Sequence, residues 1–501
     1  MKFPALKTSV VLLALALAAC ASNESISDKP VQAAASNDIG RQALPAGDGW
    51  ASVGPGTDGG AKATAANVFT VSTRAELVKA LATAGNAAKI IYIKGTVNLS
   101  TDDNNKELFE KDYADPAYNF DAYVKAYAPA VWNTKLEKGR PVRDLTGPLE
   151  EARKNSVERQ RKQITIKLNS NTSIIGLGKD AKIIKGNLWI GPEAENIIIR
   201  NITFEDSFDY FPGWDPGDSW KVDKSYPGCQ EAYVDANTGP QKCPGGRWNS
   251  EYDLISINGG KRVWIDHNTF TDGQRPDKLF PPNFPFPQNE ITQKIQHHDG
   301  LIDVTNGGDL VTISHNIFKD HDKTSLIGGS DSSKIDTGKL NVTYHDNIFD
   351  NSGQRLPRVR FGKVHSYNNY FSGDAAGADD PKLSVYENHL KAIKEHGGNN
   401  VFRGAFGIGK ESAIYSENNY FEVKNADASA VGVIQGGTVF FDQGSYFNGK
   451  PVDAVKAINA VDPKKQVSPN VGWKPTLYAR KPIPATEVPA YVKANAGAGK
   501  L

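Results

Sequence analysis

The stretch Val311-Thr312-Ile313-Ser314-His315-Asn316-Ile317-Phe318 decides the fold, because copies of it recur along the chain. An earlier copy reads Val263-Trp264-Ile265-Asp266-His267-Asn268-Thr269-Phe270, and both copies end in Asn-x-Phe. Further copies occupy residues 342–349, 364–371, 400–402 and 413–421, with a weaker one at 445–447. Repetition at intervals of about 20–50 residues is typical of a solenoid or a propeller.

Short β-rich segments with alternating apolar residues make up these copies, whereas helical repeats need amphipathic helices of about ten residues or more. Three short strands and their turns fit into the shorter intervals, so the unit predicts one coil of a parallel β-helix. Longer intervals then hold loops inserted at one corner. The recurring Asn and Phe side chains would stack from coil to coil as internal ladders, which is a structural role. The predicted fold class is therefore all-β.

Two other parts of the chain have their own patterns. Residues 108–164 interrupt the repeat, and the charged run that begins at Gly147-Pro148 predicts a helix, so we expect a helical insertion on the side of the solenoid. From residue 463 onward the chain is rich in Pro, Lys and Ala and is predicted to be a covering tail. Additional strands are expected at residues 164–168, 173–175, 183–184 and 197–204.

The charge of the chain is almost balanced. It has 58 Lys and Arg against 57 Asp and Glu among 501 residues, and 39% of its residues are hydrophobic. This composition excludes a disordered polyelectrolyte and a small disulfide-dense scaffold. A net charge of +1 creates no global field for DNA or RNA, so we expect no nucleic-acid partner, and a polyanion would need a local basic patch.

The N-terminus has the pattern of an export signal. Met1-Lys2 and Lys7 precede an apolar run that ends in Leu17-Ala18-Ala19-Cys20, and this run is too short to span a membrane as a mature helix. Cys20 resembles the lipidated cysteine of a bacterial lipobox; the alternative is an ordinary signal peptide with a chance cysteine. We expect a signal peptide at 1–19, a flexible tether at 20–48 and one domain at 49–501. The protein would be a monomer on the outer membrane or cell surface, held there only by the lipid, or otherwise periplasmic or secreted.

Two cysteines remain, Cys229 and Cys243, in a Gly-, Pro- and Tyr-rich stretch. In an exported chain they predict a disulfide that closes this loop. The alternative, a zinc site, would need two more ligands, and none is evident nearby.

Carboxylates concentrate in two segments away from the Asn-x-Phe positions. In Asn249-Ser250-Glu251-Tyr252-Asp253, a strand would point Glu251 and Asp253 to the same face. The second segment is His297-His298-Asp299-Gly300-Leu301-Ile302-Asp303, whose two histidines we take as supporting residues. If adjacent coils stack these segments, four carboxylates share one site and need a cation, and an all-oxygen site favours Ca²⁺ or Mg²⁺. The alternative is solvated surface charge.

A basic segment supplies the local patch that the net charge conceals. It reads Arg355-Leu356-Pro357-Arg358-Val359-Arg360, and Asp320-His321-Asp322-Lys323 precedes it. Beside a carboxylate cluster this patch could simply form ion pairs. Beside a cation-filled cluster it would instead bind an anion.

Several motifs occur together in one order: Val263-Trp264-Ile265-Asp266-His267, His298-Asp299-Gly300-Leu301-Ile302-Asp303, Val311-Thr312-Ile313-Ser314, His321-Asp322-Lys323 and Arg355-x-Pro357-x-x-Arg360. With Gly49-Trp50 and Asp209-Tyr210-Phe211-Pro212 upstream, the chain resembles the pectate lyases of polysaccharide lyase family one, especially the bacillary type, over about residues 49–450. The resemblance implies a right-handed parallel β-helix.

The resemblance also implies Ca²⁺ ligands at Asp253, Asp299 and Asp303. Glu251 matches a ligand that only some members have. The loop with Cys229 and Cys243 departs from the compact bacillary pattern, and its place just before Glu251 would let it reshape the cleft.

Arg355 matches the catalytic base of the family, and Lys323 and Arg360 match residues that bind substrate carboxylates. The implied reaction is Ca²⁺-dependent β-elimination on polygalacturonate. Because free guanidinium is almost always protonated, an arginine base predicts activity that rises into alkaline pH. The alternatives are a glycoside hydrolase, a pectin lyase acting on methyl esters and a non-catalytic polysaccharide-binding solenoid.

Overall fold

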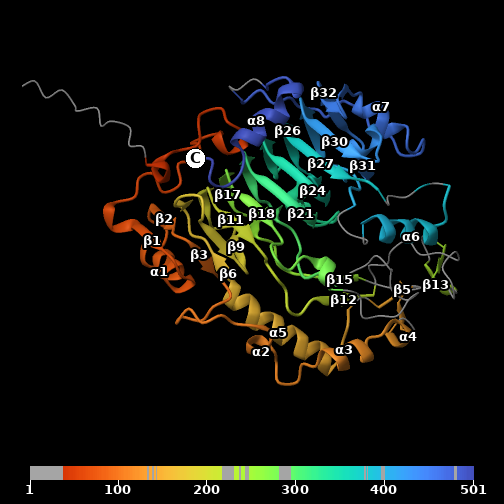
Figure 1. Cartoon of the computed structure of the whole chain (residues 1–501), viewed down its shortest axis with the longest axis horizontal. Helices are drawn as coiled ribbons and strands as arrows, with labels where there is room; N and C mark the ends of the chain where they lie inside the picture. The colour runs from red at the N-terminus through yellow and green to blue at the C-terminus, as the bar shows by residue number, and fades with distance from the viewer. Residues whose placement is uncertain are drawn as a thin grey trace, which may run out of the picture. The chain divides into compact units, whose positions relative to one another are not determined.

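The repeat builds three sheets in which the strands of successive coils pair in parallel (Figure 1). This computed structural model describes residues 38–132, 135–137, 140–142, 144–216, 231–235, 239–242, 247–280, 295–376, 380, 382–396, 401–478 and 482–501. Cys20, Cys229 and Cys243 lie outside these ranges, and so does the predicted signal peptide.

Strand order in each sheet follows the order of the chain. The first sheet contains β1 (Val68–Val71), β2 (Lys89–Ile93), β7 (Thr172–Gly176), β10 (Glu195–Arg200), β17 (Lys261–Asp266), β20 (Asp309–Ser314), β23 (Asn341–His345), β26 (Lys363–Tyr367), β29 (Ala413–Glu417) and β32 (Phe440–Gln443). The second contains β3 (Thr96–Asn98), β8 (Lys182–Ile184), β11 (Thr203–Glu205), β18 (Thr269–Thr271), β21 (Ile317–Lys323), β24 (Ile348–Gln354), β27 (Tyr370–Asp374), β30 (Tyr420–Lys424), β33 (Tyr446–Phe447) and β34 (Lys450–Pro451). The third contains β6 (Thr165–Lys167), β9 (Asn187–Ile190), β16 (Ile255–Asn258), β19 (Ile302–Thr305), β22 (Leu326–Ile327), β25 (Arg358–Val359), β28 (Phe406–Gly409) and β31 (Gly432–Gln435).

Each coil visits the three sheets in turn, as β16, β17 and β18 do before β19 begins the next coil. The strands of neighbouring coils pair in parallel and in register, for example Val263 with Val311 and Phe270 with Phe318. The fold is the predicted right-handed parallel β-helix, the usual hand of a crossover between parallel strands.

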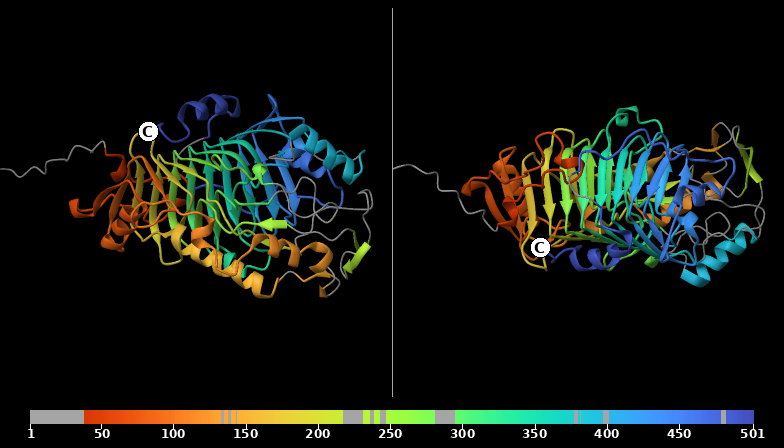
Figure 2. Two further views of the ribbon diagram at one scale, coloured as in Figure 1. Left: turned by 60° about the horizontal axis from the view of Figure 1, so that its bottom comes forward. Right: turned by 90° about the horizontal axis from the view of Figure 1, so that it is seen from above.

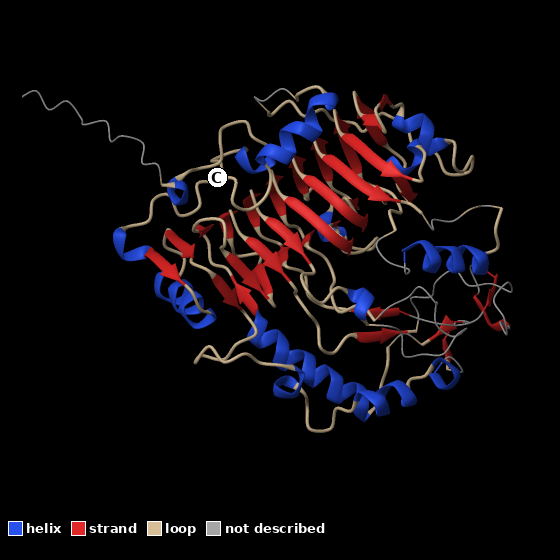
Figure 3. Ribbon diagram, in the orientation of Figure 1, coloured by secondary structure: helices blue, strands red, loops and turns tan. Residues whose placement is uncertain are grey.

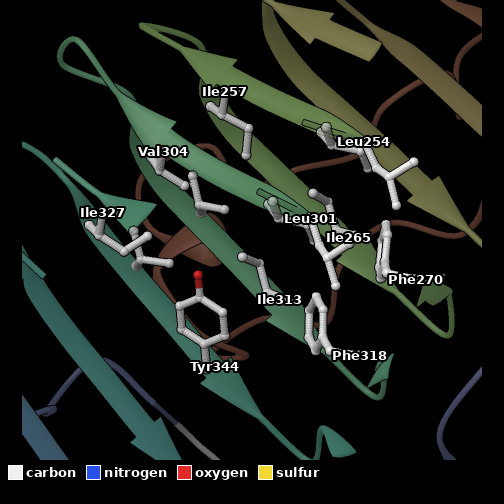
Figure 4. Packing of buried hydrophobic residues seen from close by; sticks show 14 of the residues in the cluster. Leu254, Ile257, Ile265, Phe270, Leu301, Val304, Ile313, Phe318, Ile327 and Tyr344 are labelled. Carbon is white, nitrogen blue, oxygen red and sulfur yellow. The ribbon is translucent and has the colours of Figure 1, made fainter. Parts of the chain in front are cut away.

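Apolar side chains fill the interior of the coils, one level above the next. Figure 4 shows Leu254, Leu301 and Ile327 with Phe270 and Phe318, all of which point inward. Alternate strand residues face outward, which explains the period-two pattern of the sequence. The side chains on the outer face of each sheet are therefore free to serve a site.

Buried asparagines line the corner between the first and second sheets, and we call them the asparagine ladder. Each Nδ2 donates to the Oδ1 of the next asparagine at 2.9–3.2 Å. Aromatic rings stack beside the ladder, with Phe318 and Phe349 centroids 4.9 Å apart. The ladder consists of Asn268, Asn316, Asn347, Asn369 and Asn419.

One predicted copy of the repeat is wrong. Asn369 bonds directly to Asn419, and β27 pairs directly with β30, so residues 400–402 contribute no coil. Phe402 is buried, but it lies in the connection from α6 (Val385–His396) to β28. The three-residue match to Asn-x-Phe lacked the preceding strand that the other copies have.

Helices lie on the outside of the coils (Figure 3). The predicted insertion is helical, and its longest helix, α5, runs along one side of the stack in the left view of Figure 2. Pro148 begins α5, as predicted, because proline has the backbone angle of a first helical turn and needs no donor there. The helices are α1 (Arg74–Ala84), α2 (Glu110–Tyr113), α3 (Phe120–Ala126), α4 (Pro129–Trp132), α5 (Pro148–Ile164), α6, α7 (Ala454–Asn459) and α8 (Val488–Asn495).

Short antiparallel pairs complete the inserted loops. They are β4 (Leu136–Glu137) with β5 (Arg140–Pro141), β12 (Gly213–Asp215) with β15 (Arg247–Asn249), and β13 (Glu231–Asp235) with β14 (Gly239–Lys242). In the described ranges, no helix has both the length and the apolar character to cross a membrane.

Both ends of the compact unit pack on the coils. Residues 38–48, which the sequence assigns to the tether, contact the β-helix: Leu44 is buried, and Asp48 pairs with His345 at 3.0 Å. At the other end, α8 covers Ile348 and Tyr370 of the second sheet, in agreement with the predicted covering tail.

Candidate functional site

Charged side chains gather where the chain passes from the second sheet to the third, and we call Asp253, Asp299, Asp303, Lys323 and Arg355 the charged corner. Asp253 lies just before β16, Asp299 lies just before β19 of the next coil, and Asp303 lies within β19. Lys323 ends β21, and Arg355 lies between β24 and β25. Four successive coils therefore supply the group.

Gly300 lets two of the carboxylates face one space. A Cβ at Gly300 would lie 2.5 Å from Asp303 Oδ1 and 2.8 Å from Asp253 Oδ1, so only glycine leaves this place open. Hydrogen bonds orient both groups: Gly300 N donates to Asp253 Oδ1 at 2.9 Å, and Leu326 N donates to Asp303 Oδ1 at 2.9 Å. Ser256 Oγ donates to Asp253 Oδ2 at 2.6 Å.

The three aspartates repel one another in a buried place. Burial, and then the charge of Asp299, raises the pKa of Asp253 to about 6. Burial and the two neighbouring carboxylates hold the pKa of Asp303 well above its ordinary value. Burial alone would also raise the pKa of Asp299, but Lys323 and Arg355 outweigh it and lower that pKa. A cation between Asp253 and Asp303 would remove the repulsion.

The donors fit a hard divalent cation. All of them are carboxylate oxygens, which suit Ca²⁺ or Mg²⁺ and not zinc. Asp253 Oδ1 and Asp303 Oδ1 both approach the same side of Gly300, so the two carboxylates are close enough to share an ion. Asp253 and Asp303 are thus the best-placed ligands, with Asp299 adjacent.

Two cations adjoin the aspartates. Lys323 Nζ lies 2.5 Å from Asp299 Oδ1, and its side chain is 10% exposed. Arg355 occupies a left-handed turn with φ of 60°, and its Nε is buried without a hydrogen-bond partner in the described part of the chain. The charge of Arg355 acts to lower the pKa of both Asp299 and Asp303, so Arg355 lies at the same corner. Its Nε remains available to donate a hydrogen bond.

Glu251 does not join the aspartates as expected. Residues 250–253 form no strand, since Glu251 N donates to the buried Asp209 side chain at 3.2 Å and so binds no neighbouring strand. The prediction that Glu251 and Asp253 share a strand face is therefore wrong: Glu251 is exposed, and Asp253 is buried. Glu251 nevertheless lines the same groove as Asp253 and Asp303.

A loop of the preceding coil, between β22 and β23, holds Arg360. Its Nε donates to Asp331 Oδ1 at 2.6 Å, and its Nη1 donates to Gly328 O at 2.9 Å. Its charge acts on Arg358, whose pKa it helps to lower, and Arg360 is not among the main causes of the pKa shifts of the three aspartates. The structure thus places Arg360 near the site but apart from the aspartates.

The two histidines before Asp299 support the corner. Nδ1 of His298 lies 2.9 Å from Asp277 Oδ1, and its Nε2 lies 3.1 Å from Asp206 Oδ1. His297 stacks on Phe208 with ring centroids 4.3 Å apart. Burial opposes charge on His298, but the carboxylates outweigh it and raise its pKa well above the ordinary value. This pairing fixes the backbone that leads into Asp299.

A second acid–histidine group lies at the opposite corner and serves structure. Donor atoms of His315, His345 and Asp346 lie within 4.8 Å of one another. However, Nδ1 of His345 lies 2.6 Å from Asp346, and its Nε2 lies 3.0 Å from Asp48. Burial lowers the pKa of His345, but these carboxylates outweigh it and raise that pKa to about 9. A protonated imidazole has no free lone pair for a metal.

A groove of about 880 Å³ runs from the charged corner along the third sheet. It passes over Asn187 and Trp189 of β9 toward Arg161 and Lys162 of α5. The wall opposite the coils therefore comes from the helical insertion. Such a shape suits an extended ligand that lies across several coils.

Sequence reasoning included Arg358 in the basic segment but gave it no role of its own, and it missed the role of Gly300. Arg358 and Arg360 flank the fully buried Val359, so strand alternation could have placed both arginines on the outer face. Gly300 carried no signal by itself, because its function depends on two side chains that the fold brings to it.

Comparisons with known proteins agree on one family. The family model "Pectate lyase" matches residues 144–242 and 230–501. The "Pectate lyase" of Bacillus subtilis (strain 168) is 40% identical over 470 residues, which covers 93% of this chain and 94% of that protein. A solved structure described as "Pectate lyase bound to hexasaccharide" has 40% identity and a TM-score of 0.77, and covers 93% of this chain and 100% of that one. The pectate lyase from Acidovorax avenae subsp citrulli has 32% identity and a TM-score of 0.76, with 96% and 99% covered.

Proposed function

The chain belongs to the pectate lyase family, and from this premise we propose that it cleaves pectate by Ca²⁺-dependent β-elimination. The observation that carries the proposal is the charged corner, where two buried carboxylates face one space beside cations with donors to spare. A hydrolase would need a paired acid and base with room for water. This corner instead suits an anionic sugar.

Pectate carries one carboxylate on each sugar, next to the C5 proton that elimination removes. Lys323, held at the cluster by Asp299, would bind that carboxylate and stabilise the negative charge that develops on it. Arg360 would contribute after exchanging its contact with Asp331 for the substrate. Both contacts orient C5 toward Arg355.

Arg355 would remove the C5 proton. Arg355 lies in a left-handed turn between two strands, at the charged corner. Its Nε has no hydrogen-bond partner among the described residues that would compete with the substrate. The pair of electrons left at C5 forms the C4–C5 double bond, and the C4 oxygen leaves with the rest of the chain. No water enters the broken bond.

Asp253, Asp299 and Asp303 would hold the Ca²⁺, with Glu251 as an outer ligand. When bound, the ion would neutralise the substrate carboxylate and make the C5 proton more acidic. The raised pKa values of Asp253 and Asp303 support this assignment, because burial and the neighbouring carboxylates outweigh the cations beside them.

The test is polygalacturonate cleavage followed by ultraviolet absorbance, with and without a chelator. We expect products that absorb as C4–C5 alkenes and activity that chelation abolishes and Ca²⁺ restores. New reducing ends without absorbance would identify a hydrolase. Activity that survives chelation would remove the metal from the proposal.

The sequence gives further expectations about anchoring and the disulfide. Cys20 would carry a lipid that anchors a monomeric, exported enzyme, and a Cys229–Cys243 disulfide would close the loop before Glu251. Mass spectrometry of the purified protein tests both: we expect a diacyl mass on Cys20 that Cys20→Ser removes, and a mass gain of two protons on reduction.

A further inference from the structure

Arg358 is a half-buried arginine on the outer face of the third sheet, on the same row as Asp303. Register places Ser256 beside Asp303 and Arg358 between Leu326 and Gly407. Leu326 is the residue whose N–H binds Asp303, so Arg358 lies two strands beyond that aspartate. With strands about 4.8 Å apart, the separation is about 10 Å, which is more than one sugar ring.

Among the described residues, one carboxylate, Asp331, acts on this arginine, and it is bonded to Arg360. In the described ranges no carboxylate forms an ion pair with Arg358, and its buried Nε has no hydrogen-bond partner. Burial, and then the charges of Arg360 and Arg355, lowers the pKa of Arg358 to about 10. Three guanidinium groups therefore sit close together with one carboxylate, Asp331, already used by Arg360.

Gly407 leaves a polar recess beside Arg358. A Cβ at Gly407 would lie 2.8 Å from Arg358 Cγ and 2.8 Å from Gln435 Oε1, so the arginine stem crosses the glycine. Gln435 Oε1 is also buried and also lacks a partner among the described residues. The arginine stem and the glutamine oxygen thus border the same glycine on the outer face, and Arg358 Nε and Gln435 Oε1 both lack a partner among the described residues. Buried polar atoms without a partner are costly, so water or a polar ligand has to satisfy them.

We propose that Arg358 and Gln435 form a second carboxylate subsite that binds a further uronate of the same substrate chain. Arg358 would pair with its carboxylate, and Gln435 would accept from a sugar hydroxyl. This inference rests on the proposed function and deepens it, because it predicts which pectates the enzyme prefers. A methyl ester at this sugar would remove the charge that Arg358 binds, so the subsite selects runs of unesterified units.

The experiment compares wild type, Arg358→Gln and the matched control Lys363→Gln on polygalacturonate and on highly methyl-esterified pectin. Lys363 is an exposed cation of the first sheet, so its variant loses the same charge away from the third sheet. We expect Arg358→Gln to raise KM for polygalacturonate about tenfold, the scale of one charged contact, with kcat within about twofold. Its KM for the esterified substrate should change little, and Lys363→Gln should match wild type on both.

Two further measurements separate binding from folding. Removing an unpaired half-buried cation should leave the melting temperature unchanged or higher, whereas a structural arginine would lower it. Gly407→Ala, which displaces the arginine stem, should reproduce the KM effect. A KM unchanged in Arg358→Gln, or a parallel fall in kcat and melting temperature, would overturn the subsite.

Binding without turnover distinguishes this inference from the proposed function. Calorimetry with hexagalacturonate should show about tenfold weaker binding to Arg355→Ala/Arg358→Gln than to Arg355→Ala. If wild type cleaves no pectate, the proposed function fails, but this comparison still decides whether Arg358 binds a uronate chain. Equal binding by the two variants would reject the subsite even if the wild-type enzyme is active.

Discussion

Two corners of the same coils use polar side chains in opposite ways. At the asparagine ladder every amide meets a partner: Asn316 Nδ2 donates to Ile265 O at 3.0 Å, and its Oδ1 accepts from Asn268 N at 2.9 Å. At the charged corner, carboxylates adjoin carboxylates, and Arg355 Nε has no partner in the described ranges. One corner is complete by itself, and the other needs a cation and an anion.

The difference separates structure from function within a repeat. Both corners are buried and both recur from coil to coil, so neither burial nor periodicity distinguishes them. The electrostatic balance does, because a satisfied network stabilises the fold while an unsatisfied one costs free energy unless a ligand binds. Each prediction below alters one corner and measures whether the effect falls on stability or on activity.

The largest effect is expected from Arg355→Ala. Loss of a catalytic base should lower kcat on polygalacturonate by about 10²–10⁴-fold. Unfolding by urea should shift by less than about 0.5 kcal/mol, because the side chain of Arg355 has few partners to lose. Arg262→Ala is the matched control: Arg262 also has a positive φ, of 53°, but it lies on the first sheet and pairs with Glu195. It should retain activity, and a loss as large as that of Arg355→Ala would point to backbone strain as the cause.

The fold was largely predictable from the sequence, because successive coils of a β-helix repeat the same strand pattern and ladder residue. The strand at 173–175 and the helix from Pro148 appear, but the predicted strand at 197–204 divides into β10 and β11 on two sheets, and residues 400–402 form no coil. The Asn-x-Phe match at residues 400–402 did not follow a strand pattern in the sequence. Periodicity therefore predicts a coil only when the strand and the ladder residue occur together.

The site was predictable in its residue types but not in its geometry. Asp253, Asp299, Asp303, Lys323 and Arg355 do come together, since each lies at the same corner of its own coil. Hydrogen bonds to residues far away in the sequence determine the positions of Glu251 and Arg360. Asp209 draws Glu251 away from a strand, and Asp331 holds Arg360, and neither partner is near in sequence.

Asn316→Leu should have the reverse effect of Arg355→Ala. It leaves Asn268 N and Ile265 O buried without partners, which should cost about 3 kcal/mol of unfolding free energy. The kcat of the folded enzyme should stay within about twofold, since the ladder is at the other corner. Asn155→Ala, on the exposed face of α5, is the control and should change stability by less than about 0.5 kcal/mol. Urea titration, followed by fluorescence and by activity, measures both effects. An equal loss of stability in Asn316→Leu and Asn155→Ala would contradict the prediction.

Part of the pH dependence of stability should come from His345. Its folded pKa of about 9 lies above the ordinary 6.5, so its protonated form stabilises the fold fully below about pH 6.5, and that contribution is lost as pH rises through 9. Asp48→Asn removes one of the two carboxylates and should flatten the fall between pH 6.5 and 9 by about 1–2 kcal/mol. Urea midpoints at several pH values measure the slope. Identical slopes for the two proteins would mean that another group titrates there.

Asp303→Asn should give a small effect on stability and the clearest contrast between metal-free and Ca²⁺-loaded protein. The folded pKa of Asp303 is raised, so its ionised carboxylate destabilises the metal-free fold at pH values above its unfolded pKa. Asparagine keeps the acceptor for Leu326 N but removes the charge, so in a chelator the variant should be about 1 kcal/mol more stable than wild type at neutral pH. With Ca²⁺ added, wild type should gain stability by binding the ion, and the variant should gain little. Melting curves in chelator and in Ca²⁺ give all four values. A variant less stable than wild type in chelator would show that Asp303 serves the fold, as the asparagines of the opposite corner do, and that the two corners differ less than their charges indicate.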